Sequence, residues 1–425
     1  MIATFKIANF RSIREMTVDF RFAEGKAPND HKNWDTLPFV EATPNVRLVP
    51  CLGLFGANAS GKTNILRALA ALQQATTRRA VDFFEPNKLQ DNKLTTLFEL
   101  TFFLDGDEFA YTLEYNGKGI RKEVLAKNGG LLYAVQEGKF TSFPAADENY
   151  PNEKLQAIVN VECADGKGNQ IFSFLTRVGH NYTGLNKNLL SVFEYIKYRL
   201  IILQDNDIPL PNAVDNLKKY HGDNEDKALQ AIVELVRKLD IAVKSISIKR
   251  EKLNKNQKVP YNTFITQLPD NDQYTIAKVT TYHENTQGAA VQFDFLNEES
   301  NGTQRLAGLV GIMLFALQGG YGLFVDELDC SLHSLLLREL IRLFKDKRYN
   351  KKGAQLVFTT HNTDILDDAI LRVSEVAITR KTIQTGTLIR RIVEFKDDGL
   401  DVRNVTNFRK QYLKGFYSGV PHPAI

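Results

Sequence analysis

The stretch Gly56-Ala57-Asn58-Ala59-Ser60-Gly61-Lys62-Thr63 matches the complete pattern G-x-x-x-x-G-K-[ST]. An apolar run at 48–55 precedes it and predicts a buried strand, and residues 64–72 follow it as a helix-forming segment. The glycines let backbone N–H groups turn inward onto a triphosphate, and the helix N-terminus adds partial positive charge. The pattern in this context predicts a nucleotide-binding loop between a strand and a helix.

The loop also predicts a role for its last two residues. Lys62 would reach the β- and γ-phosphates of ATP and act in catalysis, and Thr63 would place its hydroxyl on Mg²⁺. The residues expected to contact the nucleotide from this segment are Gly56, Asn58, Ser60, Gly61, Lys62, Thr63 and Asn64.

Composition is that of a soluble globular protein. The chain has 425 residues, 43% hydrophobic and 24% charged, and its length suggests two or three domains or one large domain with insertions. No apolar run is long enough to span a bilayer, and residues 1–10 alternate like a strand rather than a signal peptide. The three cysteines lack metal-ligand spacing, so we expect a reduced, cytoplasmic environment and no membrane partner.

The charge balance permits contact with DNA without arguing for it. The net charge is +4, and the densest basic run lies at 244–258. A solvated surface is the more frequent meaning of such a run, and a nucleic-acid site is the alternative.

Hydrophobic periodicity predicts an α/β chain. Strands at 2–10 and 16–22 form a hairpin, residues 23–47 form a long loop, and strands at 96–104, 108–115 and 131–135 form an antiparallel β lobe. Residues 150–240 have helical texture, and strand character returns at 279–295. Beyond them, helices at 306–318, 332–344 and 363–371 alternate with strands at 322–325 and 354–359, as a parallel sheet requires.

Three further segments carry candidate chemistry. The apolar strand Leu323-Phe324-Val325 ends in Asp326 and Glu327, a pattern in which the first carboxylate binds Mg²⁺ and the second activates the attacking water. His361 follows another apolar strand and would sense the γ-phosphate at the same rim. Ser300 and Gly302 precede a helix, where free N–H groups make a weak anion-site signal.

The order of these pieces resembles that of ATPases of the ABC/SMC superfamily, with Walker A, signature, Walker B and histidine switch in turn. Residues 5–13, which include Asn9-Phe10-Arg11-Ser12-Ile13, and residues 407–415 resemble the ends of stand-alone bacterial AAA-type ATPases tied to abortive infection. The relatives concerned are the AbiL/RloA type and the ATPase domain of OLD-family proteins.

This resemblance implies a P-loop ABC/SMC-type ATPase head with an antiparallel β lobe and an inserted helical lobe. Residues 1–150 would form the N-terminal half of the ATPase core, 151–295 a mainly helical inserted lobe, and 296–425 the C-terminal half of the core. ATP and Mg²⁺ would be the cofactors. Arg11 would touch the nucleotide, His333 would lie at the subunit interface, and Gln204 would be the Q-loop residue.

The resemblance further implies a homodimer closed around ATP, or a larger assembly. Ser300 and Gly302 of one protomer would close on the γ-phosphate held by Lys62 of the other. Because the sequence ends at residue 425, too little chain follows His361 for the Toprim nuclease domain of OLD proteins. We therefore expect nuclease or toxin activity to come from a separate polypeptide.

Two functions stay open at this stage. The first is a regulatory ATPase of bacterial antiphage defence that controls an effector such as a Toprim-type nuclease. The alternative is an ATP-gated DNA-binding clamp in repair, similar to RecF or SMC heads. An energy subunit of a transporter fits poorly, because Leu332-His333 replaces the Leu-Asp pair of those proteins.

Overall fold

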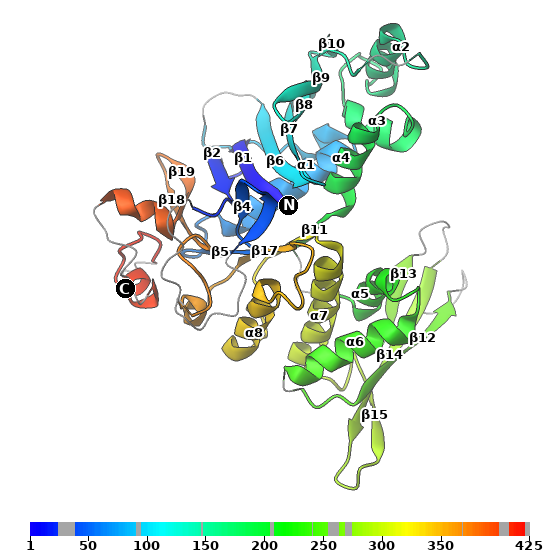
Figure 1. Cartoon of the computed structure of the whole chain (residues 1–425), viewed down its shortest axis with the longest axis vertical. Helices are drawn as coiled ribbons and strands as arrows, with labels where there is room; N and C mark the ends of the chain where they lie inside the picture. Colours follow the sequence, from blue (N-terminus) through cyan, green and yellow to red (C-terminus); the bar gives the residue numbers. More distant parts are fainter. Residues whose placement is uncertain are drawn as a thin grey trace.

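The fold is built on one large mixed sheet, shown in Figure 1. The computed structural model describes residues 1–23, 39–90, 95–145, 148–204, 208–239, 241–253, 263–267, 274–367, 369–398 and 408–420. The sheet has 13 strands in the order β10-β9-β8-β7-β6-β1-β2-β19-β18-β5-β17-β16-β11. The strands are β1 (Ile2–Phe10), β2 (Ile13–Asp19), β5 (Cys51–Phe55), β6 (Thr96–Leu104), β7 (Asp107–Asn116), β8 (Gly119–Lys127), β9 (Gly130–Gln136), β10 (Lys139–Ser142), β11 (Leu200–Leu203), β16 (Gly322–Val325), β17 (Gln355–Thr359), β18 (Val376–Thr382) and β19 (Gly386–Arg391).

The parallel part of the sheet confirms the α/β fold predicted from the sequence. Strands β11, β16, β17, β5 and β18 pair in parallel, so their carboxyl ends meet at one edge. Their side chains alternate between two apolar cores. In β5, Leu52 and Leu54 face one core while Cys51 and Phe55 face the other. Burial on both faces explains why these strands read as continuous apolar runs.

The predicted antiparallel lobe is a continuation of the same sheet. Strand β6 pairs with β1, and β7 to β10 follow as successive antiparallel neighbours. Strand β8 was not predicted, because Arg121, Lys122 and Glu123 interrupt its apolar alternation. Glu123 is nonetheless fully buried, where it accepts hydrogen bonds from the hydroxyl groups of Tyr133 and Tyr111 at 2.7 and 3.2 Å.

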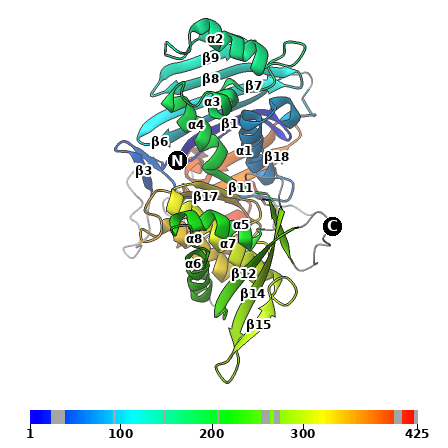
Figure 2. The ribbon, with the colours of Figure 1, turned by 90° about the vertical axis from the view of Figure 1, so that its right-hand side faces the viewer.

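Helices cover both faces of the sheet, as Figures 1 and 2 show. Helices α1, α3 and α4 contribute to one core and α5 to α8 to the other. The helices are α1 (Lys62–Thr77), α2 (Asn152–Ala157), α3 (Phe174–Asn181), α4 (Lys187–Tyr198), α5 (Leu210–Leu217), α6 (Glu225–Lys238), α7 (Asn301–Gly319), α8 (Ser334–Lys345) and α9 (Phe408–Leu413). In the part of the chain that the structure describes, none of them is long and apolar enough to cross a membrane.

A second sheet lies beside α5 and α6 and projects away from the large sheet (Figure 2). It holds β12 (Ser245–Lys252), β13 (Phe264–Gln267), β14 (Tyr274–Glu284) and β15 (Ala290–Asp294), with β14 paired to the other three. Residues 151–295 were predicted to be a mainly helical inserted lobe with strand character at 279–295, and this division of the chain stays a prediction. Their last third is a sheet, because alternating Ile, Thr and Val residues favour strands there.

Two shorter predictions are wrong. The predicted loop at 23–47 contains the hairpin β3 (Val40–Thr43) and β4 (Val46–Leu48), while 24–38 lie outside the described residues. The predicted helix at 363–371 is a single 3-10 turn at Thr363–Ile365. Asp367 accepts a hydrogen bond from the N–H of Ala369 at 2.9 Å, a local bond that competes with helix formation.

Candidate nucleotide site

The glycine loop connects β5 to α1 and is closely packed on β18 and β19. Gly56 and Gly61 have φ values of 151° and 103°. A Cβ atom on Gly56 would lie 2.4 Å from the carbonyl oxygen of Thr379, and one on Gly61 would lie 2.2 Å from Oγ1 of Thr387. Both the backbone conformation and the close approach therefore require glycine at these two positions.

Hydroxyl groups of β18 and β19 hold the side of the loop that faces these strands. Ser60 Oγ lies 2.7 Å from Thr379 Oγ1, which donates to the Phe55 carbonyl at 3.0 Å. Asn64 donates to Ser12 Oγ at 2.7 Å, and Ser12 Oγ lies 2.7 Å from Thr387 Oγ1. The side chains of Ser60 and Asn64, expected at the nucleotide, thus bond to protein groups, while Asn58 is exposed at the loop tip.

Lys62 is buried within the loop. Its Nζ donates to the carbonyl oxygens of Gly56 at 2.8 Å and Ala57 at 3.2 Å. Burial lowers its pKa to about 8, although the carboxylates of Asp326, Asp329 and Glu327 act in the opposite direction. The ammonium group therefore lies inside the glycine loop. Two carbonyl oxygens and the nearby carboxylates only partly offset the cost of burying its charge.

The acidic turn after β16 meets the loop at the carboxyl edge of the sheet. Thr63 Oγ1 donates to Asp326 Oδ1 at 3.1 Å, and Thr359 Oγ1 at the end of β17 donates to the same oxygen at 2.5 Å. Because the pair Thr63 and Asp326 offers a hydroxyl and a carboxylate, both hard oxygen donors, it fits Mg²⁺. Thr359 could not be predicted from local sequence, because only the pairing of β16 with β17 brings it here.

Glu327 presents an exposed carboxylate from a fixed backbone. Its φ is 48°, and its N–H donates to Thr359 Oγ1 at 2.8 Å. The guanidinium of Arg305, a buried residue of α7, donates to the Glu327 carbonyl at 2.7 Å. The turn is thus held by β17 on one side and by α7 on the other, while the Glu327 side chain is exposed.

His361 follows β17 at the same edge and is exposed. Its backbone N–H donates to Asp329 Oδ2 at 3.3 Å, and Asp329 Oδ1 is buried without a hydrogen-bond partner among the described residues. Asp329 is a second residue at this edge whose position local sequence did not predict. His333 caps α8, where its Nδ1 accepts from the N–H of Leu335 at 3.3 Å.

Two candidates from distant segments also take defined positions. Gln204 directly follows Leu203, whose carbonyl accepts from the N–H of Asp326 at 2.9 Å, so Gln204 lies at the strand end next to the acidic turn. Arg11 contacts a different segment: its guanidinium pairs with Glu85, and its N–H donates to the Glu85 carbonyl at 2.8 Å.

Ser300 caps the N-terminus of α7. Its Oγ accepts from the N–H of Thr303 at 3.1 Å, and the residue is exposed. Gly302 lies close to the segment after the acidic turn, since a Cβ there would be 3.0 Å from the Ser331 carbonyl. The nucleotide, metal and catalytic roles of all the candidate residues, those of the glycine loop and the acidic turn included, stay predictions.

A family model described as "AAA domain, putative AbiEii toxin, Type IV TA system" matches residues 51–367. The chain belongs to this family. The match spans the glycine loop, the Ser300 turn, the acidic turn and His361. Membership in an AAA family supports nucleotide binding and hydrolysis as the general class of activity of this chain. The finer assignment to the AbiL/RloA or OLD type stays a prediction.

Solved structures of SMC heads align with most of the chain. A head bound to the C-winged helix domain of ScpA is 13% identical and covers 94% of this chain and 99% of its own, with a TM-score of 0.44. The head domain from Thermotoga maritima is 13% identical, covers 92% and 98%, and has a TM-score of 0.35. These scores are too low to carry an argument. No curated protein matches the sequence.

Proposed function

We propose that the chain is an ATP-binding and ATP-hydrolysing dimeric switch of bacterial antiphage defence. The family and its description, which names a toxin and a type IV system, support this context. The observation that carries the enzymatic part is the contact of Thr63 and Thr359 with the Asp326 carboxylate. It joins the glycine loop, the acidic turn and a neighbouring strand at one edge of the sheet, where ligands of open α/β sheets bind.

Each side chain then has a defined task. Lys62 binds phosphate oxygens, and Thr63 with Asp326 holds Mg²⁺, which when bound offsets the charge of the triphosphate. The exposed Glu327 carboxylate accepts a proton from the attacking water. His361 donates a hydrogen bond to the γ-phosphate and thereby distinguishes ATP from ADP.

The proposed dimer uses the exposure of the Ser300 turn. In an ATP-bound homodimer, Ser300 and Gly302 of one copy complete the site that Lys62 and Glu327 of the other copy begin. A helix N-terminus with free N–H groups suits the terminal phosphate. Closure and hydrolysis would then control a separate effector, such as a Toprim-type nuclease or a toxin.

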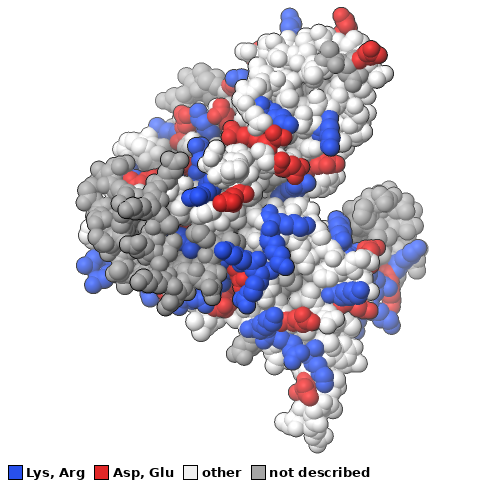
Figure 3. All heavy atoms as spheres, in the orientation of Figure 1, with Lys and Arg blue, Asp and Glu red and all other residues white. Residues whose placement is uncertain are grey.

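A DNA clamp is the second candidate, and the charges of the described residues favour it less. In the basic run at 244–258, Arg250 pairs with Asp215 and Glu225, and Lys244 lies 3.8 Å from Glu284. Lys255 and Lys258 lie outside the described residues. On the face in Figure 3, acidic groups are interspersed among the basic ones. DNA-stimulated hydrolysis that falls steeply with salt would support the clamp instead.

The first test traps the closed dimer. Glu327→Gln keeps the size of the side chain but removes the base, so we expect ATP-dependent dimers to accumulate and hydrolysis to fall by about 10²-fold or more. Size-exclusion chromatography with light scattering, with and without ATP, measures this. Glu339→Gln, at an exposed position of α8, is the matched control. Hydrolysis at the wild-type rate in Glu327→Gln would contradict the proposal that Glu327 accepts a proton from the attacking water.

The second test asks whether each site is shared between two copies. Lys62→Ala and Ser300→Arg should each lack activity alone. In an equal mixture, half of the dimers are mixed and each has one intact site, so activity should return to about a quarter of wild type. If Ser300→Arg leaves both hydrolysis and dimerisation unchanged, the hypothesis that two copies share each nucleotide site is wrong.

A further inference from the structure

The segment between β15 and Ser300 is a closely hydrogen-bonded connection. The carboxylate of Asp294, the last residue of β15, accepts from the N–H groups of Leu296 and Asn297, both at 3.1 Å. Gln304 in the first turn of α7 donates to the Leu296 and Glu299 carbonyl oxygens at 3.2 and 2.9 Å. The start of α7 is therefore fixed to the end of the small sheet.

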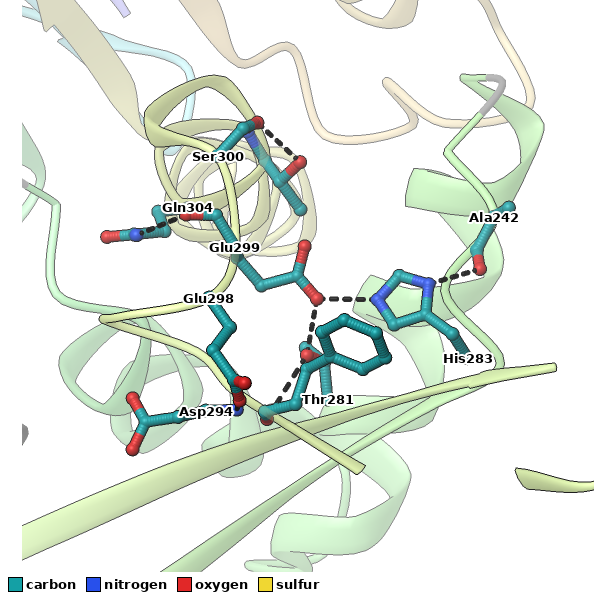
Figure 4. A network of polar contacts seen from close by, with 10 residues as sticks. Ala242, Thr281, His283, Asp294, Glu298, Glu299, Ser300 and Gln304 are labelled. Carbon is teal, nitrogen blue, oxygen red and sulfur yellow. Dashed lines mark hydrogen bonds and ion pairs between the residues drawn. The ribbon is translucent and has the colours of Figure 1, made fainter. Parts of the chain in front are cut away.

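Figure 4 shows a second connection at the same place. Glu299 directly precedes Ser300, and its Oε1 accepts from Thr281 Oγ1 and faces His283 Nε2, both at 2.5 Å. His283 Nδ1 lies 2.9 Å from the Ala242 carbonyl oxygen. Thr281 and His283 are alternate residues of β14, so both extend from one face of the small sheet.

The surroundings of the imidazole ring show which of its atoms can donate in this contact. Both ring nitrogens of His283 face oxygen atoms, and a carbonyl oxygen can only accept, so Nδ1 carries a proton. When Nε2 also donates to the Glu299 carboxylate, the ring is positively charged. The Glu299 side chain is only 8% exposed and that of His283 is 26% exposed, so water screens the pair poorly.

We infer that His283 and Glu299 are positioning residues that set the Ser300 turn, so that the small sheet governs closure of the nucleotide site. The inference rests on the proposed function. The contacts of Thr281 and His283 with the side chain of Glu299 fix the backbone from which α7 begins. A phosphate-binding turn depends on such placement, because small displacements of binding groups greatly lower the reaction rate. A ligand that moves β14 would alter hydrolysis without touching ATP.

The test separates positioning from ATP binding. For His283→Ala we expect kcat to fall about tenfold, with the KM for ATP unchanged, because Lys62 and the glycine loop are not altered. The same substitution in Glu327→Gln should weaken the ATP-dependent dimer by a similar factor. Glu299→Gln, which keeps the side-chain volume, should have the same effect as His283→Ala. His283→Gln, whose amide can still donate to Glu299, should recover part of the loss.

Tyr282→Phe is the matched control, because Tyr282 lies on the opposite face of β14, and it should keep wild-type kcat. Suppose that His283→Ala and Glu299→Gln both keep wild-type kcat and dimerisation while Ser300→Arg is inactive. This result would overturn the inference and leave the proposed function standing. A full-length Ser300→Arg that retains activity would count against the proposed function instead. If His283→Ala, Glu299→Gln and Tyr282→Phe all raise KM and lower the melting temperature to the same extent, the inference would also be overturned, since that pattern indicates a purely structural role.

Discussion

At the scale of single residues, Lys62 combines a functional charge with a buried position. Its ammonium group donates to two carbonyl oxygens of its own loop, and burial lowers its pKa to about 8. A bound triphosphate favours the charged form, so binding must raise this pKa. The affinity for ATP is therefore linked to pH in a range close to neutrality.

We predict that ATP binds more weakly as the pH rises above about 8. Below the lowered pKa, Lys62 is already protonated and binding takes up no proton there. Above it, the empty site loses its charge, and affinity should fall up to about tenfold per pH unit. Calorimetric titration in two buffers of different ionisation enthalpy, between pH 7.5 and 9.5, measures both the affinity and the proton uptake.

Lys62→Arg provides the comparison, because arginine stays charged throughout this range. Its ATP affinity, whatever its absolute value, should not change with pH. Constant affinity of the wild-type protein up to pH 9.5 would contradict the assignment of Lys62 to the phosphates.

At the scale of secondary-structure elements, the end of β17 holds the acidic turn. Thr359 Oγ1 donates to Asp326 and accepts from the N–H of Glu327. We predict that Thr359→Val lowers kcat by about 10–100-fold, as for other residues that orient a metal ligand. The loss of both bonds should also lower the free energy of unfolding by about 1–3 kcal/mol.

Thr359→Ser retains the hydroxyl and should restore most of the activity. Steady-state hydrolysis and urea unfolding of the three proteins separate the two effects. A Thr359→Val protein with wild-type kcat would show that β17 only supports the fold.

At the scale of the whole molecule, a buried ion pair joins α8 to the start of β18. Lys345 Nζ lies 2.6 Å from Glu375, and their side chains are 1% and 0% exposed. Burial lowers the pKa of Lys345. Lys345→Met leaves the Glu375 charge without this partner, so we predict a loss of about 3–5 kcal/mol in the free energy of unfolding.

Urea unfolding monitored by circular dichroism measures the loss, with Lys347→Met on the exposed surface as the control. Hydrolysis by the folded Lys345→Met protein should stay near the wild-type rate, since the pair is not part of the nucleotide site. Equal unfolding midpoints for both variants would contradict the prediction.

Local sequence patterns predicted the elements that carry the site because each is encoded within a short stretch. The glycine loop lies between its strand and helix as expected, and β16 spans the predicted residues 322–325. Predictions failed where local bonds or charged residues interrupt the periodicity. Strand β8 contains Arg121 and Lys122, which interrupt its apolar alternation. The predicted helix at 363–371 ends after the 3-10 turn Thr363–Ile365, because side chains such as Asp367 bond to nearby backbone N–H groups.

By itself, the sequence determined that a glycine loop, an acidic strand end and an apolar α/β core are present, because spacing and hydrophobic period are local properties. Only the tertiary structure decided which strands are neighbours. That pairing places Thr359 on Asp326, Thr379 and Thr387 under the glycine loop, and His283 on Glu299. Residues so far apart along the chain carry no mutual signal in their spacing, and only the burial of shared apolar faces brings them together.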